Sequence, residues 1–200
     1  YIAEFLLRAR DAGFVVPEAL LQKTRERLSE DLLTGGPPFY GYAQSAHLGF
    51  AYQAHAGYVL ARVNRAPLGT LRALYDNERA RAVTALPLLQ LGLALVLQGD
   101  AGRGDRAIAE ALARKDNRPG WLGDYGSAVR DAALMLALLR EHGRREPGQE
   151  QRLLALSREL QARAAESYAW YSTQEQIALA RLGRALALDA DRTFGGRLLA

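Results

Sequence analysis

Helical hydrophobic periodicity runs through almost the whole chain, and two kinds of helical segment alternate along it. Segments of the first kind carry one apolar stripe among charged residues, which is typical of an outer, half-exposed helix. Segments of the second kind are apolar on nearly every side, as in the stretch from Ala132 to Leu139, and belong inside a helical assembly. The inner segments recur about every forty residues, the length of a repeating helix pair. We expect inner helices at residues 47–63, 84–98, 127–141 and 173–188 and outer helices at residues 17–33, 104–115 and 150–164.

A repeat of paired helices can build either an open solenoid or a closed two-layer ring. The charge-poor inner segments favour the ring, because its inner helices are covered by outer helices and also pack against one another. No segment of the sequence shows the strict alternation of a half-buried strand. The sequence therefore predicts an all-α fold, an α/α toroid of alternating inner and outer helices, complete or incomplete within this chain.

The connections between the segments are short and rich in glycine or proline, and none has the length or composition of an interdomain linker. We therefore expect residues 1–200 to form a single helical domain. Ile2, Phe5, Leu6 and Ala9 recur at helical spacing from the very start of the sequence, so we also expect the chain to be a piece of a longer protein.

Composition argues against several classes of function. The 200 residues are 49% hydrophobic and 24% charged, which suits a globular domain with a substantial core. The net charge is +4, but the basic residues are spread among acidic ones, without the basic runs of a nucleic-acid surface. No signal peptide is visible, and the longest apolar run, residues 91–97, is far too short to cross a bilayer. We expect no nucleic-acid partner and no membrane insertion by this segment.

The stretch WYSTQE, from Trp170 to Glu175, has the spacing of a capping box. The Ser172 hydroxyl can accept from the backbone N–H of Glu175, while the Glu175 carboxylate can accept from the backbone N–H of Ser172. Both donors would otherwise be unpaired at a helix start. The sequence therefore predicts that an inner helix begins directly after Ser172.

Three motifs follow one another along the chain. The first, at residues 56–76, reads AGYVLARVNRAPLGTLRALYD, and the second, at residues 124–139, reads DYGSAVRDAALMLALL. The third is WYSTQE, which opens the last inner helix. In this combination the chain resembles the thioester-containing, complement-like domain of bacterial alpha-2-macroglobulins, over about residues 42–188.

The resemblance implies an α/α toroid and a place in a broad-range protease inhibitor. In that family a large multidomain protein is cut in a bait region, changes shape and entangles the attacking protease. The expected partners are therefore attacking proteases, through the full-length parent, and neighbouring β-sandwich domains of the same chain. The resemblance also implies a periplasmic parent, which can be anchored to the inner membrane.

The reaction of the resembled family is an internal thioester between a cysteine sulfur and a glutamine side-chain carbonyl, held in a C-x-x-Q loop. This chain contains no cysteine and cannot itself hold that bond. Two explanations stay open: the chain starts downstream of the thioester loop, or the parent belongs to the branch of the family that lacks it. Gln174 and Glu175 follow a threonine at a helix start and do not match the loop.

An α/α-barrel enzyme acting on carbohydrate is the first alternative, because such enzymes need two carboxylates that face each other across one rim. Asp124 and Glu175 both lie near the starts of inner helices and could share a rim. Helix capping explains both more simply, since Glu175 completes the capping box and Asp124 lies just before Ser127, where a carboxylate suits a helix N-terminus. The second alternative is a TPR-like helical module that binds peptides. We expect a binding and conformational role, with no catalytic, cofactor-binding or metal-binding residue in this chain.

The histidines give only weak signals for a metal site. His47 and His55 are separated by residues none of which is acidic. His142 precedes Gly143 at an expected helix end, where a partly charged imidazole is favourable. The absence of cysteine also excludes disulfides and thiolate zinc sites. Packing and hydrogen bonding are the expected roles of the histidines.

Two further features invite a functional interpretation. Residues 99–105, GDAGRGD, lack the preceding strand and the Lys-Ser or Lys-Thr of a phosphate-binding loop, so we expect an ordinary loop and attribute the tripeptide Arg103-Gly104-Asp105 to chance. Core packing is the commoner role of tyrosine, but clustered tyrosines can also form a contact surface for another domain. The clusters are Tyr40, Tyr42, Tyr52 and Tyr58, and then Tyr168 and Tyr171 beside Trp170.

Overall fold

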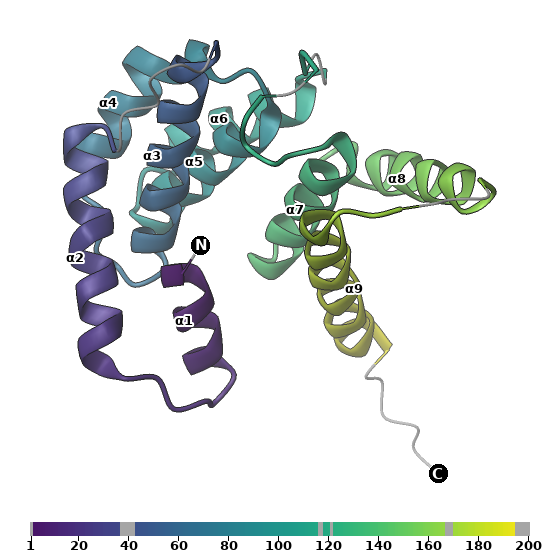
Figure 1. Ribbon diagram of the computed structural model, residues 1–200, viewed down its shortest axis with the longest axis horizontal. Coiled ribbons are helices and arrows are strands. Elements are labelled where there is room, and N and C mark those ends of the chain that lie inside the picture. Colours follow the sequence, from purple (N-terminus) through teal and green to yellow (C-terminus); the bar gives the residue numbers. More distant parts are fainter. Residues whose placement is uncertain (1, 37–42, 116–117, 121, 167–169, 195–200) are drawn as a thin grey trace. The chain divides into compact units, whose positions relative to one another are not determined.

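The computed structural model describes residues 2–36, 43–115, 118–120, 122–166 and 170–194. Every regular element within these ranges is a helix, so the expected all-α fold is confirmed. The chain divides into two compact units, residues 1–123 and residues 124–200 (Figure 1). The single domain expected over residues 1–200 remains a prediction.

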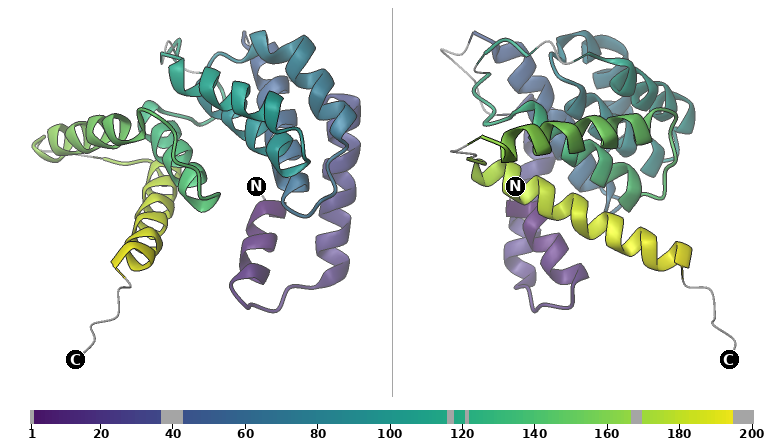
Figure 2. Two further views of the ribbon diagram at one scale, coloured as in Figure 1. Left: turned by 180° about the vertical axis from the view of Figure 1, so that it is seen from behind. Right: turned by 90° about the vertical axis from the view of Figure 1, so that its right-hand side faces the viewer.

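The first unit, residues 1–123, is built from helices joined by short turns (Figures 1 and 2). Its helices are α1 (Ile2–Asp11), α2 (Glu18–Thr34), α3 (Ser45–Ala61), α4 (Leu68–Glu78), the short 3-10 helix η1 (Arg79–Arg81), α5 (Ala85–Leu97) and α6 (Ala101–Ala113). α1 and α2 form a helical hairpin, α3 packs between α2 and α5, and α6 packs on α5. Two prolines set helix starts: Pro17 precedes α2 and Pro67 precedes α4, with φ of −60° and −68°, the value that the proline ring fixes.

The core of the first unit lies between α3 and α5. Phe50 and Tyr58 of α3 are buried, as are Leu88 and Leu91 of α5. α2 and α6 are buried along one stripe each and carry their charged residues on the other side. The expected inner positions of α3 and α5 and the expected outer positions of α2 and α6 are therefore confirmed.

α5 and α6 come into backbone contact at two glycines. A Cβ atom added to Gly104 would lie 2.7 Å from the carbonyl oxygen of Gly92 and 2.5 Å from Cγ2 of Val96. A Cβ atom added to Gly92 would lie 2.9 Å from the carbonyl oxygen of Gly104. Neither position has room for a side chain, so glycine is required at both for the helices to pack this closely.

A loop was expected over residues 99–105, with the helix beginning at Gly104. This prediction is wrong for the residues after Asp100, because α6 begins at Ala101. Asp100 is the N-cap residue, and its carboxylate accepts a hydrogen bond of 3.2 Å from the backbone N–H of Arg103. A capping carboxylate satisfies a donor that the first turn leaves unpaired, which stabilises a helix start in this glycine-rich stretch. The tripeptide Arg103-Gly104-Asp105 is therefore helical.

The second unit contains α7 (Ala128–Glu141), α8 (Gln149–Ala164) and α9 (Thr173–Phe194). α9 lies along α7, and α8 also packs on α7 (Figures 1 and 2). α7 is buried on nearly every side, as expected of an inner helix, and α8 is largely exposed, as expected of an outer one. The shared core consists of Val129, Ala133, Leu136 and Ala137 of α7, Leu156 of α8, and Ala178, Leu182 and Ala185 of α9.

α9 corrects one expectation. Residues 173–188 were expected to form an inner helix, but within its unit α9 is buried against α7 only along the stripe of Ala178, Leu182 and Ala185, and Ile177 is 44% exposed. The apolar residues of α9 thus extend around the helix beyond the stripe that α7 covers. Ile177 is one of the apolar residues outside that stripe. Leu134 of α7 is half-buried and packs against the same core.

The layering within each unit, charge-poor helices against amphipathic ones, agrees with the alternation expected of an α/α toroid. Among the described helices none is both long enough and apolar enough to cross a membrane.

Candidate functional site

The capping box predicted at the start of α9 is present. The hydroxyl of Ser172 accepts a hydrogen bond of 3.2 Å from the backbone N–H of Glu175. In return, the carboxylate of Glu175 accepts one of 2.9 Å from the backbone N–H of Ser172. Two donors that would be unpaired at the helix start are therefore satisfied by neighbouring side chains.

Glu175 also binds the start of α7. Ser127 is the N-cap residue of α7, and its hydroxyl accepts from the backbone N–H of Arg130 at 3.1 Å. The same hydroxyl donates to Oε1 of Glu175 at 2.6 Å, and Nη1 of Arg163 donates to that oxygen at 3.1 Å. The buried carboxylate therefore joins the first turns of α7 and α9 to the last turn of α8. We call Ser127, Arg163, Ser172 and Glu175 the double-cap cluster.

The electrostatics of the double-cap cluster keep Glu175 ionised. Burial alone would raise the pKa of this carboxyl. The hydrogen bonds from Ser127, from the backbone of Ser172 and from Arg163 together lower the pKa by more than burial raises it, so the pKa lies below its usual value. A general acid needs the opposite shift, towards the working pH. The side chain is therefore suited to fixing helices.

Asp124, the other carboxylate that could have formed a catalytic pair, is held by donors of its own. Its Oδ1 accepts from the backbone N–H of Gly126 at 3.0 Å, and its Oδ2 accepts from Nη2 of Arg130 at 3.1 Å. Arg130 also donates to Oδ1 of Asp131 through Nε at 2.7 Å. Asp124 thus fixes the turn before α7, and its backbone partner is Gly126, which precedes the helix.

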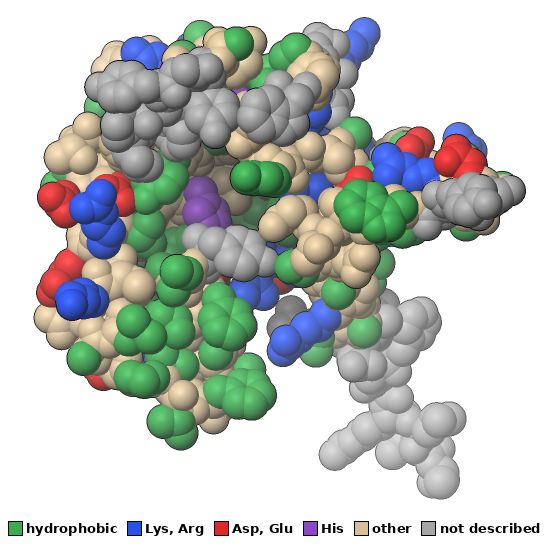
Figure 3. Space-filling view, viewed as in Figure 1, with side chains coloured by type: hydrophobic (Ala, Val, Ile, Leu, Met, Phe, Trp, Pro, Cys, Tyr) green, Lys and Arg blue, Asp and Glu red, His purple; other side chains and the backbone are tan. Residues whose placement is uncertain are grey.

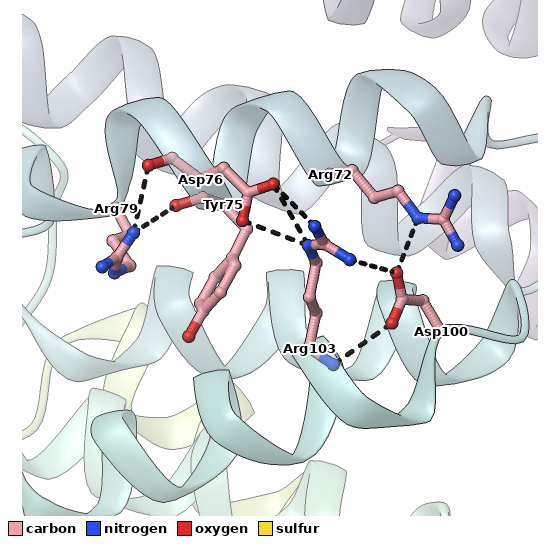
Figure 4. Close-up of polar contacts among 6 residues, drawn as sticks. All are labelled: Arg72, Tyr75, Asp76, Arg79, Asp100 and Arg103. Atoms are coloured by element: carbon pink, nitrogen blue, oxygen red, sulfur yellow. Dashed lines mark hydrogen bonds and ion pairs between the residues drawn. The ribbon is translucent and has the colours of Figure 1, made fainter.

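A second polar cluster joins α4 to the start of α6 (Figure 4). Arg103 donates to both carboxylate oxygens of Asp76 at 3.0–3.1 Å and to Oδ2 of Asp100 at 3.2 Å. Arg72 donates to the same oxygen of Asp100 at 2.6 Å. The pKa of Asp76 is lowered by the hydrogen bonds from Arg103, and that of Asp100 by the hydrogen bond from Arg72. We call these four residues the α4–α6 ion cluster.

Tyr75 extends this connection between α4 and α6. Its hydroxyl donates to Oε1 of Glu110 at 2.8 Å, and the guanidinium of Arg79 lies 5.0 Å from the centre of its ring. The motif LRALYD at the end of residues 56–76 therefore supplies three of the polar side chains that bind α4 to α6. Arg103 and Gly104 of the Arg-Gly-Asp tripeptide are both committed to helix packing.

His47 and His55 take part in hydrogen bonds, as expected. His47 is buried, and its Nδ1 accepts from the backbone N–H of Val83 at 3.1 Å. Nδ1 of His55 lies 3.2 Å from Nε2 of Gln90, and its Nε2 lies 3.8 Å from Oε2 of Glu4. Within the described residues, no three His, Asp or Glu side chains are grouped so that they could hold a metal ion.

Part of the tyrosine clusters can be placed. The hydroxyl of Tyr52 donates to Oδ2 of Asp31 at 2.6 Å; burial, and then this hydrogen bond, raise the pKa of Tyr52 to about 12. Tyr58 is fully buried, and Tyr171 lies beneath the guanidinium of Arg163. Tyr58 is therefore a core residue, Tyr52 and Tyr171 are half-buried, and Trp170 is exposed. A contact surface for another domain stays a prediction. Tyr40, Tyr42 and Tyr168 lie outside the described residues.

Three similar proteins found by comparison with known sequences are all named alpha-2-macroglobulin. Over 99% of its length the chain is 59% identical to an alpha-2-macroglobulin of Xylella fastidiosa, and over 90% of its length it is 44% identical to the alpha-2-macroglobulin of Escherichia coli. The chain belongs to the bacterial alpha-2-macroglobulin family. It spans only 12% and 11% of the length of these two relatives. No protein-family model matches the chain.

Solved structures of bacterial alpha-2-macroglobulins match in fold. One is the native Escherichia coli protein from domain MG7 to the C-terminus, with a TM-score of 0.84 and 42% identity over 93% of this chain and 29% of that one. Trypsin-activated Escherichia coli alpha-2-macroglobulin gives a TM-score of 0.81 and 43% identity, over 92% of this chain and 12% of that one. The Salmonella protein reacted with methylamine gives 0.81 and 42% identity over the same shares.

Sequence reasoning found one half of the double-cap cluster and missed the other. The bonds between Ser172 and Glu175 follow from a four-residue pattern, but Ser127 and Arg163 come from helices that the pattern does not include. The α4–α6 ion cluster was missed altogether, since Arg103 and Asp76 are 27 residues apart and no local rule pairs them.

Proposed function

We propose that this chain is part of the complement-like thioester domain of a bacterial alpha-2-macroglobulin, a periplasmic, broad-range protease inhibitor that traps proteases by changing shape. Within that protein the segment acts as a rigid helical element that moves as a body and carries out no turnover. Attacking proteases and the neighbouring β-sandwich domains of the parent are its proposed partners.

One observation carries the proposal. The chain matches the native and the trypsin-activated forms of the Escherichia coli protein over nearly the same share of its length, with TM-scores of 0.84 and 0.81. A segment whose fold resembles both forms this closely does not need to refold when the protein is activated. The shape change would then come from movement of whole domains, as in hinge or shear motions.

The polar clusters support a rigid role. Hydrogen bonds to charged groups are stronger than those between neutral groups, and the double-cap cluster concentrates three of them on one buried carboxylate. The α4–α6 ion cluster also joins α4 to α6, through ion pairs that are largely exposed and therefore individually weaker. Interactions of this kind hold helices in fixed register, which suits an element that transmits movement.

The chemistry of the thioester would have to come from elsewhere in the parent. A methylamine-reacted relative fits a family in which an amine attacks an activated acyl group. This chain has no cysteine, so it cannot supply the sulfur of a thioester. A parent with the C-x-x-Q loop outside this chain and a parent without that loop are both compatible with the proposal.

The test uses the full-length parent and trypsin. We expect limited proteolysis to change its mobility on a native gel, and the trapped trypsin to keep its activity on small substrates while losing activity on large ones. Hydrogen exchange of the buried helices α3, α5 and α7 should be equal before and after activation. A parent that is digested without a change in mobility, or whose α3, α5 and α7 lose protection on activation, would contradict the proposal. Fractionation of the cells tests the periplasmic location.

A further inference from the structure

The basic residues of this chain are almost all arginine. Lys23 and Lys115 are the only lysines among its 26 basic residues, although lysine is one of the commonest residues of soluble globular domains. Basic side chains lie on the visible surface singly or beside acidic ones (Figure 3). The surface therefore carries its positive charge almost without the primary amines that usually supply part of it.

The structure requires a guanidinium at some of these positions. Arg103 donates to both carboxylate oxygens of Asp76 and to Asp100, and Arg130 donates to two carboxylates and to a backbone carbonyl. A planar guanidinium can serve several acceptors at once, whereas a lysine ammonium is a point charge on a flexible stem. The contacts of these residues therefore explain why they are arginines.

At other positions the structure gives no reason for a guanidinium. Arg10, Arg65, Arg158 and Arg184 are exposed, and none of them makes a side-chain hydrogen bond or ion pair with any residue that the structure describes. A lysine would supply the same charge and the same solubility at these four positions. Packing and ion pairing therefore leave the choice of arginine there unexplained.

The two side chains differ in their reactivity as nucleophiles. An ammonium with the usual lysine pKa of about 10.4 is a free amine in roughly one molecule in a thousand near pH 7.4. A guanidinium is not deprotonated in proteins, so it offers no free amine to an acyl group. Salmonella alpha-2-macroglobulin has been reacted with methylamine, a primary amine like that of lysine. A lysine within reach of the reactive group of such a protein would therefore consume that group.

We propose that the scarcity of lysine in residues 1–200 prevents an amine-reactive acyl group of the parent from reacting with its own chain, and keeps that group available for lysine amines of a captured protease. This rests on the proposed function and adds that the parent belongs to the branch of the family with the thioester. In a parent without a reactive group, nothing would disfavour lysine at exposed, contact-free positions such as Arg65 and Arg184.

The reaction that the arginines avoid is an acyl transfer. The lone pair of a free amine attacks the acyl carbon of the thioester, and the bond from that carbon to sulfur breaks. The sulfur leaves as a thiolate with the electron pair of the broken bond, and the nitrogen gives up one proton to water. The product is an amide, so a lysine of the same chain would spend the group irreversibly.

The test introduces amines into the full-length parent without changing its charge. One variant carries Arg10→Lys, Arg65→Lys, Arg158→Lys and Arg184→Lys, and a matched control carries Arg→Gln at the same four positions. Porcine elastase, which has been used to activate Escherichia coli alpha-2-macroglobulin, suits the experiment because it does not select for arginine or lysine.

After activation by elastase, we expect mass spectrometry of the lysine variant to show amides that join the four substituted positions to an acyl group outside residues 1–200. Denaturing gels should show several-fold less covalently attached elastase on this variant than on the wild type. The wild type and the Arg→Gln control should form no such internal amides and should attach elastase equally. The wild type should also take up methylamine at a site outside residues 1–200.

Four results would each overturn the proposal: no methylamine uptake by the wild type, no covalent attachment of elastase to it, internal amides at Lys23 or Lys115 of the wild type, or equal behaviour of the lysine variant and the wild type. Reduced elastase attachment in the Arg→Gln control would overturn it as well, because the lost guanidinium would then be the cause. A change in native-gel mobility without methylamine uptake would contradict this proposal alone. Methylamine uptake without a change in mobility on proteolysis would contradict the protease trap alone.

Discussion

The hydroxyl of Ser127 donates a hydrogen bond of 2.6 Å to the carboxylate of Glu175, across 48 residues of sequence. The N-cap residue of α7 is thereby bonded to the residue that completes the capping box of α9. Glu175 therefore takes part both in a local capping motif and in a contact between two helices.

Ser172→Ala should lower the free energy of unfolding by about 0.5–2 kcal/mol, because the N–H of Glu175 loses its acceptor at the helix start. Urea denaturation followed by circular dichroism measures the change. Ser172→Thr keeps a hydroxyl in the same position and should retain most of the stability. If alanine and threonine behave alike, the hydroxyl does not cap α9.

Glu175→Gln should cost as much as Ser172→Ala or more, on the order of 1–3 kcal/mol. A glutamine could complete a capping box, but it leaves the donors of Ser127 and Arg163 without a charged acceptor. In a double-mutant cycle with Arg163→Gln, the double mutant should lose less stability than the sum of the two single-mutant losses, because each substitution removes the same ion pair. Strict additivity would show that Arg163 and Glu175 do not interact.

The free energy of unfolding should decrease in acid because Glu175 becomes protonated. Its pKa is lowered in the folded protein from an ordinary value of 4.5, so its stabilising effect is fully present above pH 4.5 and is lost as the pH falls through the folded-state pKa. Denaturation midpoints measured from pH 7 down to pH 3 should therefore decline more steeply for the wild type than for Glu175→Gln. Parallel curves would contradict this assignment. Asp76 and Asp100 act in the same direction in both proteins.

Tyr52 should titrate late in alkali, near pH 12, because burial and the hydrogen bond to Asp31 both disfavour its phenolate. The folded-state pKa is raised above 10.0, so the associated stability is present below pH 10 and is lost as the pH rises towards 12. Absorbance at alkaline pH follows tyrosine ionisation. Tyr52→Phe should remove a tyrosine that titrates near pH 12; an unchanged titration curve would show that Tyr52 does not titrate there.

Gly104→Ala should destabilise the chain by about 1–3 kcal/mol, because the added methyl group would overlap Val96 and the backbone of Gly92. Gly102→Ala, in the same helix, is a matched control. A Cβ at Gly102 meets nothing closer than 4.0 Å, and alanine favours the helix, so this change should stabilise by up to about 1 kcal/mol. Equal effects of the two substitutions would mean that α5 and α6 are not in backbone contact.

Periodicity and capping rules predicted much of this fold, since helix formation depends on residues a few positions apart. The start of α9 after Ser172 followed from its own sequence, and so did the burial of α3 and α5. The start of α6 was placed too late because Asp100, an N-cap residue, lies in a stretch whose glycines suggest a loop.

Local pattern could not predict which of two apolar faces is covered. Phe5 and Leu6 are neighbours with similar hydrophobicity, yet Phe5 is exposed and Leu6 is buried, because only one side of α1 meets the rest of its unit. Ile177 and Ala178 of α9 differ in the same way. Pairs such as Arg103 with Asp76 also depend on how helices meet, which no spacing rule within a single helix describes.

The sharing of Glu175 by two helix starts has a consequence for local unfolding. If the first turn of α9 frays, Ser127 loses its acceptor, and the first turn of α7 is weakened at the same moment. The amides near Ala128 and near Thr173 should therefore exchange with solvent through one common opening event, as a single cooperative foldon, although more than forty residues separate them.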